Sequence, residues 1–195
     1  MIAAIVLAAG RSSRMGSLNK LLKIVGGKSI IASVVSAALG SSANPVIVVT
    51  GFEADRVATA LHGLGVTIVN NRAYEEGLST SLQAGLAALP SDCDGAVILL
   101  GDMPQVAASD IAALIAAAED RNTICIPVNN GKVGNPILWG AAHFSEMMQL
   151  TGDAGAKQLL AKHPESIIEV PIISDRIFVD IDTPSDLARF ENSIE

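Results

Sequence analysis

The sequence predicts an α/β fold in which helices cover a mostly parallel β-sheet. Short runs of β-branched residues alternate with longer Ala- and Leu-rich segments of helical period, a pattern typical of this class. Half of the 195 residues are hydrophobic but only 3% are aromatic. The core is therefore built mainly from Ala, Val, Ile and Leu, as in buried parallel strands. The length suits one core, and with no repeat or linker we expect a single domain over residues 1–195.

Each predicted strand is a short apolar run that stops at turn residues. The predicted strands are 2–7, 21–25, 46–50, 66–69, 95–100, 124–128, 136–139, 167–170 and 177–181. The predicted helices are 30–39, 53–61, 79–89, 111–119, 143–150, 153–162 and a last one that starts at residue 184. Ser79, Ser109 and Thr183 are the expected N-caps, because their hydroxyls accept hydrogen bonds from free backbone N–H groups. Asp186 is expected in the first turn of the last helix, where a negative charge is favourable.

Composition and charge exclude several classes of protein. A mean hydropathy of +0.45 with 17% charged residues excludes intrinsic disorder. No apolar run reaches the roughly 18 residues of a membrane span, and no basic segment precedes the apolar start, so we expect no membrane association and a cytoplasmic protein. The net charge of -7 argues against nucleic acid as a partner. Cys93 and Cys125 have neither a disulfide framework nor metal-ligand spacing, and we expect buried thiols.

The charges are unevenly distributed along the chain. The first 52 residues contain no Asp or Glu but five cations, whereas all 20 acids lie in the remainder. The five cations are Arg11, Arg14, Lys20, Lys23 and Lys28. Apart from chance in an Ala-rich stretch, this asymmetry indicates a local anion site in an acidic protein, which suits a small phosphorylated ligand.

The segments that follow the predicted strands indicate where this site lies. In open α/β sheets, ligands bind beyond the carboxyl ends of the strands. The sequence places there glycine turns, a cationic loop and two acids, at 8–16, 50–51, 70–71, 101–102 and 182–183. We expect these segments, although distant in the chain, to converge on one edge of the sheet.

The loop after the first strand, LAAGRSSRMGSLNK at 7–20, contains small residues and cations. It is not a Walker A loop, because Met15 stands where that motif needs glycine, and it is not a GxGxxG fingerprint. A small-residue turn still lets backbone N–H groups approach anionic oxygens, and nearby Arg and Lys side chains would neutralise a triphosphate. The alternative is a surface turn with solvated cations.

The whole string LAAG-x-S-x-RMG followed by Lys20 resembles the signature of nucleotidyltransferases, in particular of the molybdenum cofactor cytidylyltransferases and their guanylyltransferase relatives. Further motifs of the resemblance follow in the family's order: GLSTSLQAGL at 77–86, LLGDMP at 99–104, GNP at 134–136 and DIDTPSD at 180–186. Many sugar-nucleotide and isoprenoid relatives have Pro before the lysine, where this chain has Asn19. The resemblance implies a three-layer α/β/α, Rossmann-like nucleotidyltransferase fold.

The resemblance also implies a metal site. In the family an Asp of the GDMP motif and an acid or Asn of the last motif coordinate the metal, here Asp102 and Asp182, with Asp180 as the alternative second ligand. Carboxylates at strand ends are the usual ligands of Mg²⁺ in phosphoryl transfer, and Mn²⁺ is the alternative metal. Asp182 would otherwise serve as a cap of the Thr183 turn.

The same resemblance assigns the substrates to residues. The strand end and turn Leu7, Ala8, Ala9 and Gly10 would bind the nucleotide through backbone groups. Arg14 and Lys20 would stabilise charge on the transferring and leaving phosphates. Ser81 would approach the base or ribose, unless it is packed in its helix, and Asn135 and Pro136 would lie near the acceptor.

By resemblance, the chain transfers CMP from CTP to the terminal phosphate of molybdopterin cofactor and releases pyrophosphate. An Ala-Ala-Gly turn tends to accompany CTP in the family and a Gly-Gly turn GTP, and this chain has Ala8-Ala9-Gly10. The alternatives are a GTP-dependent guanylyltransferase, an enzyme with another small phosphorylated acceptor, and a non-catalytic nucleotide-binding chaperone that carries the cofactor. The resemblance also implies that the modified cofactor is delivered to a recipient molybdoenzyme or its chaperone, although no residue of this chain indicates such a partner.

Overall fold

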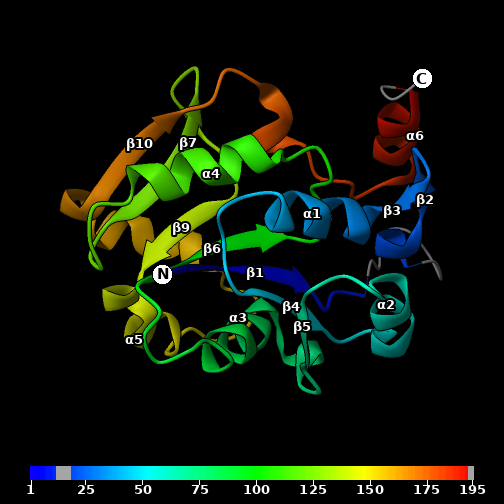
Figure 1. The fold of residues 1–195 in the computed structure, drawn as a ribbon, viewed down its shortest axis with the longest axis horizontal. Coiled ribbons are helices and arrows are strands. Elements are labelled where there is room, and N and C mark those ends of the chain that lie inside the picture. Colours follow the sequence, from blue (N-terminus) through cyan, green and yellow to red (C-terminus); the bar gives the residue numbers. More distant parts are fainter. Residues whose placement is uncertain (12–18, 193–195) are drawn as a thin grey trace.

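The computed structural model describes residues 1–11 and 19–192, with an eight-stranded sheet at its centre (Figure 1). The strand order is β10-β7-β9-β6-β1-β4-β5, with β8 paired to β7. All neighbours from β6 through β1 and β4 to β5 are parallel, as are β10 and β7, while β9 is antiparallel to β6 and β7. The strands are β1 Ile2–Ala8, β4 Val46–Thr50, β5 Thr67–Asn70, β6 Gly95–Leu100, β7 Ile124–Asn129, β8 Lys132–Val133, β9 Ile137–Gly140 and β10 Ile167–Pro171.

Helices cover both faces of this sheet, with α1 and α4 on one side and α3 and α5 on the other (Figure 1). The α-helices are α1 Ile30–Leu39, α2 Ala54–Ala60, α3 Leu78–Ala87, α4 Ala108–Ala117, α5 Phe144–Met147 and α6 Pro184–Asn192. The 3₁₀ helices are Lys20–Leu22, Tyr74–Glu76, Ala141–His143, Ala156–Lys162, Pro164–Ser166 and Asp175–Phe178, and a small hairpin pairs β2 Ile24–Val25 with β3 Lys28–Ser29. Within the described ranges, no helix has the length and apolar character needed to cross a membrane.

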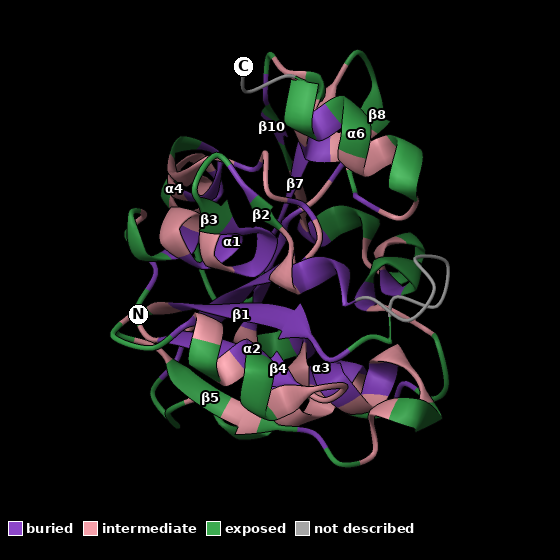
Figure 2. Cartoon of the chain, turned by 90° about the vertical axis from the view of Figure 1, so that its right-hand side faces the viewer, coloured by how far each residue is buried: buried purple, intermediate pink, exposed green. Residues whose placement is uncertain are grey.

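The sequence of β1 explains why the sheet is buried on both faces. Its residues alternate between the two hydrophobic clusters, with Ile5 and Leu7 facing α3 and with Val6 and Ala8 facing α1. Because successive side chains of a strand point to opposite faces, a continuous apolar run is what a central strand requires. Figure 2 shows β1 buried along its length. The three-layer α/β/α fold with a mostly parallel sheet is therefore confirmed.

The predicted strand at 177–181 is wrong. Residues Asp175–Phe178 form a 3₁₀ helix, and the chain then runs across the ends of other strands. Ile177 accepts a hydrogen bond from Asn135 N at 2.9 Å, and Ile181 N donates to Asp102 O at 3.0 Å. Both isoleucines are fully buried, so their apolar character reflects packing over the strand ends. This path brings Asp182 beside Asp102.

The helix starts were predicted with mixed success. Thr183 and Asp186 cap α6 reciprocally, since Asp186 Oδ2 accepts from Thr183 N at 2.9 Å and Asp186 N donates to Thr183 Oγ1 at 3.3 Å. Ser79 is not a cap, because α3 begins one residue earlier, after Gly77. Ser109 is not a cap either: α4 begins at residue 108, and Asp110 Oδ2 accepts from the N–H of residue 107.

The segments expected as helices at 143–150 and 153–162 are only partly α-helical in the structure. The first is a 3₁₀ turn followed by the four-residue α5, and the second is the 3₁₀ run Ala156–Lys162. Gly152, with a φ of 64°, lies in the left-handed region and separates the two segments. The segment between them, 151–155, is consequently a loop that reaches toward the start of α3.

Candidate active site

A cavity of about 680 Å³ lies where the parallel strands β1 and β6 end. The loop that follows β1 forms one side and Asp102, two residues beyond β6, lies close to it. The described residues that line the cavity are Leu7, Ala8, Ala9, Gly10, Arg11, Lys20, Leu21, Tyr74, Glu75, Gly77, Leu78, Ser81, Leu100, Asp102, Asp153 and Asp182. Of the segments expected to converge on this edge of the sheet, the described cavity lining contains residues of 8–16, 101–102 and 182–183, and none of 50–51 or 70–71.

Lys20 is the central charged group of this cavity. Its Nζ donates to Asp102 Oδ2 at 2.6 Å and to Asp182 Oδ1 at 2.7 Å. The backbone that holds Lys20 is fixed by the 3₁₀ turn Lys20–Leu22, whose first turn is capped by Asn19 Oδ1 accepting from Leu21 N at 3.1 Å. The residue is only 8% exposed, which explains why its ammonium needs both carboxylates.

The titration behaviour of the cluster follows from burial and charge. Burial opposes the ammonium form of Lys20, but attraction and hydrogen bonding by Asp102 and then Asp182 outweigh it, so the pKa of Lys20 is raised. The pKa of Asp180 is also raised, by burial first and then by repulsion from Asp182 and Asp102. Three carboxylates thus crowd around one ammonium, leaving an excess of negative charge at this point.

The donor set fits a divalent cation held jointly with a substrate. Asp102 and Asp182 lie close together on either side of the Lys20 ammonium, and Mg²⁺ is commonly bound by one or two carboxylates together with phosphate oxygens and water. The negative charge in excess of the one ammonium would be relieved by such an ion. No group of three or more His, Cys, Asp or Glu side chains in the described part of the chain forms an all-protein metal site.

A hydrogen-bonded group at the start of α3 forms another wall. Asn71 Nδ2 donates to Ser81 Oγ at 3.0 Å and to Thr80 Oγ1 at 2.9 Å, and Asn71 Oδ1 accepts from Ala73 N at 2.9 Å. Asn71 follows β5, so this network ties a strand end to the first turn of the helix. Ser81 is 3% exposed, so it is packed in its helix, and it also lines the cavity. The two alternatives considered for Ser81 are therefore both met.

The mouth of the cavity beside the glycine turn carries an aromatic and an ion pair. The Arg11 guanidinium lies over the Tyr74 ring, 5.7 Å from its centroid, and forms an ion pair with Glu75. Interaction with Tyr74, and then with Glu75, raises the pKa of Arg11. A Cβ on Gly51 would lie 2.7 Å from the Tyr74 side chain and 2.8 Å from that of Ala9, so glycine at position 51 permits this close packing.

The residues expected to bind nucleotide and metal are placed as follows. The cavity lining includes Leu7, Ala8, Ala9, Gly10, Lys20, Ser81, Asp102 and Asp182. Arg14 lies outside the described residues. Asn135 lines a smaller neighbouring cavity, whereas Pro136 is buried and lines neither of the two cavities. Asp180 has a raised pKa beside the two cavity acids.

Sequence reasoning missed Tyr74, Glu75 and Asp153, which also line the cavity. Tyr74 and Glu75 lie two to three residues before the GLSTSLQAGL motif, and Asp153 is an acid between two glycines in TGDAG. Asp153 was expected at the start of the helix 153–162, since nothing local showed that this segment contacts the start of α3.

An α/β/α sheet whose strand ends hold a glycine turn, a lysine and paired carboxylates defines a nucleotidyltransferase. The MobA-like NTP transferase domain matches residues 4–167, and the chain belongs to this family. The molybdenum cofactor cytidylyltransferase of Escherichia coli (strain K12) is 30% identical over 183 residues, covering 93% of this chain and 91% of that protein.

Solved structures support the same assignment. A nucleotidyl transferase from Methanothermobacter thermautotroptrophicus has a TM-score of 0.88 and 28% identity, covering 100% of this chain and 97% of that chain. The Rv0371c protein of Mycobacterium tuberculosis H37Rv, solved in complex with manganese, has a TM-score of 0.83 and 27% identity, covering 98% of each chain. A divalent metal is thus present in a structural relative.

Proposed function

We propose that this nucleotidyltransferase transfers CMP from CTP to the terminal phosphate of molybdopterin cofactor and releases pyrophosphate. The observation that carries the proposal is the Lys20 ammonium between Asp102 and Asp182 at the edge of a cavity that also holds the Ala8-Ala9-Gly10 turn. The choice of acceptor and base is supported by the 30% identical cytidylyltransferase and by the alanines of that turn.

The described side chains have distinct tasks in this reaction. The turn ending at Gly10 presents backbone N–H groups to the triphosphate, and a Cβ on Gly10 would meet nothing within 4 Å, so this turn is open to a ligand. Lys20 neutralises charge that develops on the transferring phosphate, and Arg14 is assigned the same role toward the leaving pyrophosphate. The attacking phosphate is already anionic near neutral pH, so no general base is needed.

Asp102 and Asp182 would hold Mg²⁺, which when bound supplies positive charge to the reacting phosphates. The structure already brings the two carboxylates together, at the Lys20 ammonium. Catalysis is then mainly alignment for in-line attack together with fixed electrostatic stabilisation.

The proposal is tested by measuring pyrophosphate release with molybdopterin cofactor and Mg²⁺, comparing CTP, GTP, UTP and ATP in parallel. Release with CTP alone supports both the reaction and the base. Preference for GTP keeps the mechanism and overturns the interpretation of Ala8 and Ala9. Silence with all four, in protein that still binds a nucleotide, contradicts the proposed acceptor and favours another phosphorylated acceptor or a cofactor chaperone.

A further inference from the structure

An ion pair outside the cavity joins the two stretches of chain that carry Asp102 and Asp182. Arg176 lies in the 3₁₀ helix Asp175–Phe178, and Asp110 lies in the first turn of α4. Arg176 Nε donates to Asp110 Oδ2 at 2.7 Å, and Arg176 Nη2 donates to Asp110 Oδ1 at 2.5 Å. Asp110 is 1% exposed, and neither residue lines either of the two cavities. The pair can therefore act on the reaction only through the chain that it holds.

The geometry of this ion pair makes it a stiff link. Two parallel hydrogen bonds from a planar guanidinium to a carboxylate fix the orientation of the partners as well as their distance. Asp110 Oδ2 also accepts from Ala107 N at 2.9 Å, so the carboxylate is held by the start of its own helix. On the other side, Arg176 N donates to Ser174 Oγ at 3.3 Å, which holds the backbone that carries the guanidinium.

The link lies a short way along the chain from each of the two aspartates in the cavity. Asp110 is eight residues after Asp102, and Arg176 is six residues before Asp182. The same two stretches are joined a second time beside the cavity, where Ile181 N donates to Asp102 O at 3.0 Å. One hydrogen bond lets one stretch pivot about the other, whereas two separated links fix the angle between them. A fixed separation of two metal ligands needs such support from residues behind them.

The chain between Arg176 and Asp182 is packed tightly enough to carry a displacement from one end to the other. Ile177 and Ile181 are both fully buried. A Cβ on Gly134 would lie 2.7 Å from atoms of Ile177, so the segment closes against the loop before β9. Close-packed segments transmit strain instead of absorbing it. A shift at Arg176 would consequently move Asp182 relative to Asp102.

We infer that the ion pair between Asp110 and Arg176 positions Asp182 against Asp102 and thereby sets the affinity of the site for its divalent cation. The inference rests on the metal role that the proposed function gives to these two aspartates, and it adds two positioning residues outside the cavity. An ion pair that only stabilises the fold would lower the melting temperature and leave the metal affinity of the folded protein unchanged.

Binding of Mn²⁺ alone, followed by the electron paramagnetic resonance signal of the free ion, reports on this site without nucleotide or acceptor. Arg176→Lys keeps the charge but loses the two-pronged geometry, so we expect the Kd for Mn²⁺ to rise several-fold. Asp102→Asn removes a ligand and should abolish the same binding, which identifies the site that is being measured.

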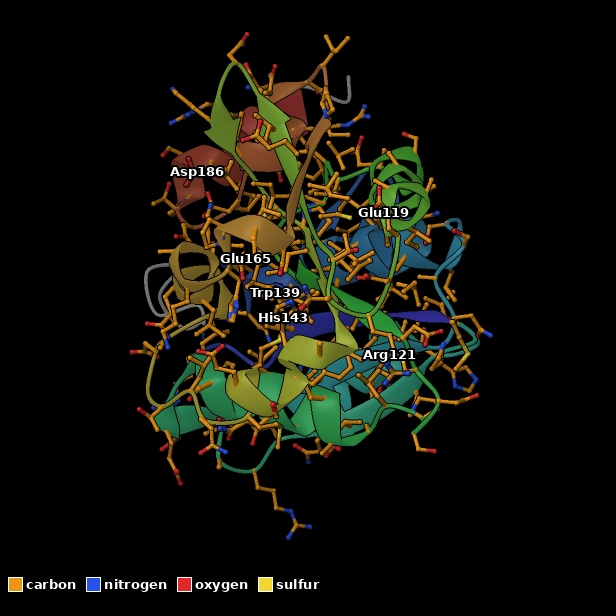
Figure 3. The ribbon with its side chains drawn as sticks, turned by 90° about the vertical axis from the view of Figure 1, so that its left-hand side faces the viewer. Glu119, Arg121, Trp139, His143, Glu165 and Asp186 are labelled. Carbon is orange, nitrogen blue, oxygen red and sulfur yellow. The ribbon has the colours of Figure 1, made fainter. Side chains whose placement is uncertain are left out.

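Two control variants separate positioning from stability. Arg121→Lys makes the same change at an exposed arginine, whose Nη1 donates to Asp94 Oδ1 at 3.0 Å, and should bind Mn²⁺ as the wild type does. Figure 3 shows Arg121 well apart from Asp186, which lies in the first turn of α6 just beyond the cavity acids. Met147→Ala removes a fully buried side chain on the opposite face of the sheet from α4. It should lower the melting temperature more than Arg176→Lys and leave the Kd for Mn²⁺ unchanged.

A double variant removes the link without leaving a buried charge. Arg176→Met alone would leave the Asp110 carboxylate buried without its partner, so it is combined with Asp110→Asn. The asparagine oxygen can still accept from the N–H of residue 107. We expect the double variant to fold and to bind Mn²⁺ about tenfold more weakly than the wild type. Wild-type affinity in both the double variant and Arg176→Lys would overturn the inference.

The two proposals fail separately. If both variants weaken Mn²⁺ binding but the wild type transfers no nucleotide to molybdopterin cofactor, the proposed function is wrong and the positioning role stands. If transfer occurs and both variants bind Mn²⁺ as the wild type does, the positioning role is wrong and the function stands. Where transfer occurs, the Mn²⁺ concentration that half-saturates turnover of Arg176→Lys should rise by the same factor as its Kd. Absence of saturable Mn²⁺ binding by the wild type would overturn the metal assignment and the positioning role together.

Discussion

Lys20 lies between two carboxylates that would otherwise repel each other. Its Nζ lies within 2.7 Å of both Asp102 and Asp182, and the side chain is largely buried. Two partly buried carboxylates close to one ammonium leave a net negative charge, which a divalent cation would balance. The ion-pair geometry seen here is therefore consistent with a site that binds metal and phosphate together.

Asp102→Asn tests whether the charge of the Asp102 carboxylate is needed for the reaction. Asparagine keeps the size of the side chain but removes its charge, so we expect kcat to fall at least about a hundredfold. The melting temperature should change little, because the Asp102 side chain is 22% exposed and Lys20 keeps Asp182 as a partner. Asp92→Asn, an exposed position outside both cavities, is the matched control. Wild-type turnover of Asp102→Asn would contradict the metal assignment.

Cys125 is expected to be unreactive in the folded protein. Burial, with a smaller contribution from Glu119, raises the pKa of its thiol to about 11. Because this pKa is well above 8, little of the thiol is deprotonated near pH 8, and the thiolate is the reactive form. Both cysteines are buried, and an aromatic disulfide reagent should label neither in native protein and both after denaturation. Fast labelling of Cys125 under native conditions would show that this region opens readily.

Half of the described cavity residues were among the predicted site residues. Asp102 and the Ala8-Ala9-Gly10 turn were predictable because they follow strands directly, and Lys20 because it completes the LAAG-x-S-x-RMG string. Tyr74 was not, because its position depends on Gly51, whose missing side chain lets the ring pack against Ala9. Such a contact joins residues 23 positions apart in the sequence and leaves no periodic pattern to detect.

At the scale of elements, the segment 177–182 shows where periodicity misleads. Its buried isoleucines match a strand pattern, yet they pack across the strand ends and Gly134 closes against Ile177. A Cβ on Gly134 would lie 2.7 Å from atoms of Ile177, so this close approach requires glycine. The secondary structure of this segment therefore cannot be assigned from its own residues. Asp182 was still expected at the site because of the resemblance of DIDTPSD to the family's last motif.

Gly77→Ala tests the contact between α3 and the loop 151–155. Gly77 has a φ of 116°, and an added Cβ would overlap the Gly152 backbone. We expect a loss of about 3 kcal/mol or more in the free energy of unfolding, from roughly 1 kcal/mol of backbone strain and the remainder from overlap.

Gly63→Ala is the matched control for this change. Gly63 has a φ of 82° but a Cβ there would meet nothing within 4 Å, so only the strain of about 1 kcal/mol remains. Urea denaturation of both variants gives the comparison. Equal losses would mean that the Gly77–Gly152 contact does not stabilise the fold.

At the scale of the molecule, several acidic side chains far from the cavity are held in ion pairs. The net charge is -7, and several partly exposed carboxylates have lowered pKa values because they hold a partner. One such group joins α5 to the 3₁₀ run Ala156–Lys162: Glu146 accepts from Lys162 Nζ at 2.7 Å and contacts His163 Nε2 at 2.6 Å. These contacts hold the end of the 3₁₀ run against α5.

Glu146 should make stability depend on pH in one direction. Hydrogen bonding by Lys162, and then by His163, lowers the pKa of Glu146 from its ordinary 4.5. A carboxylate with a lowered pKa in the folded state stabilises the fold above its unfolded pKa. This stability is lost as the pH falls through the folded value, because the unfolded chain then binds more protons.

Glu146→Gln should therefore lower the melting temperature at pH 7 but lose less stability than the wild type between pH 5 and pH 3, so the two curves converge in acid. Glu165→Gln removes an exposed carboxylate for which no ion pair is seen among the described residues, and its curve should run parallel to the wild type. Melting curves at closely spaced pH values provide the measurement. If the wild type and Glu146→Gln stay equally far apart from pH 7 to pH 3, the ion pair does not contribute to acid sensitivity.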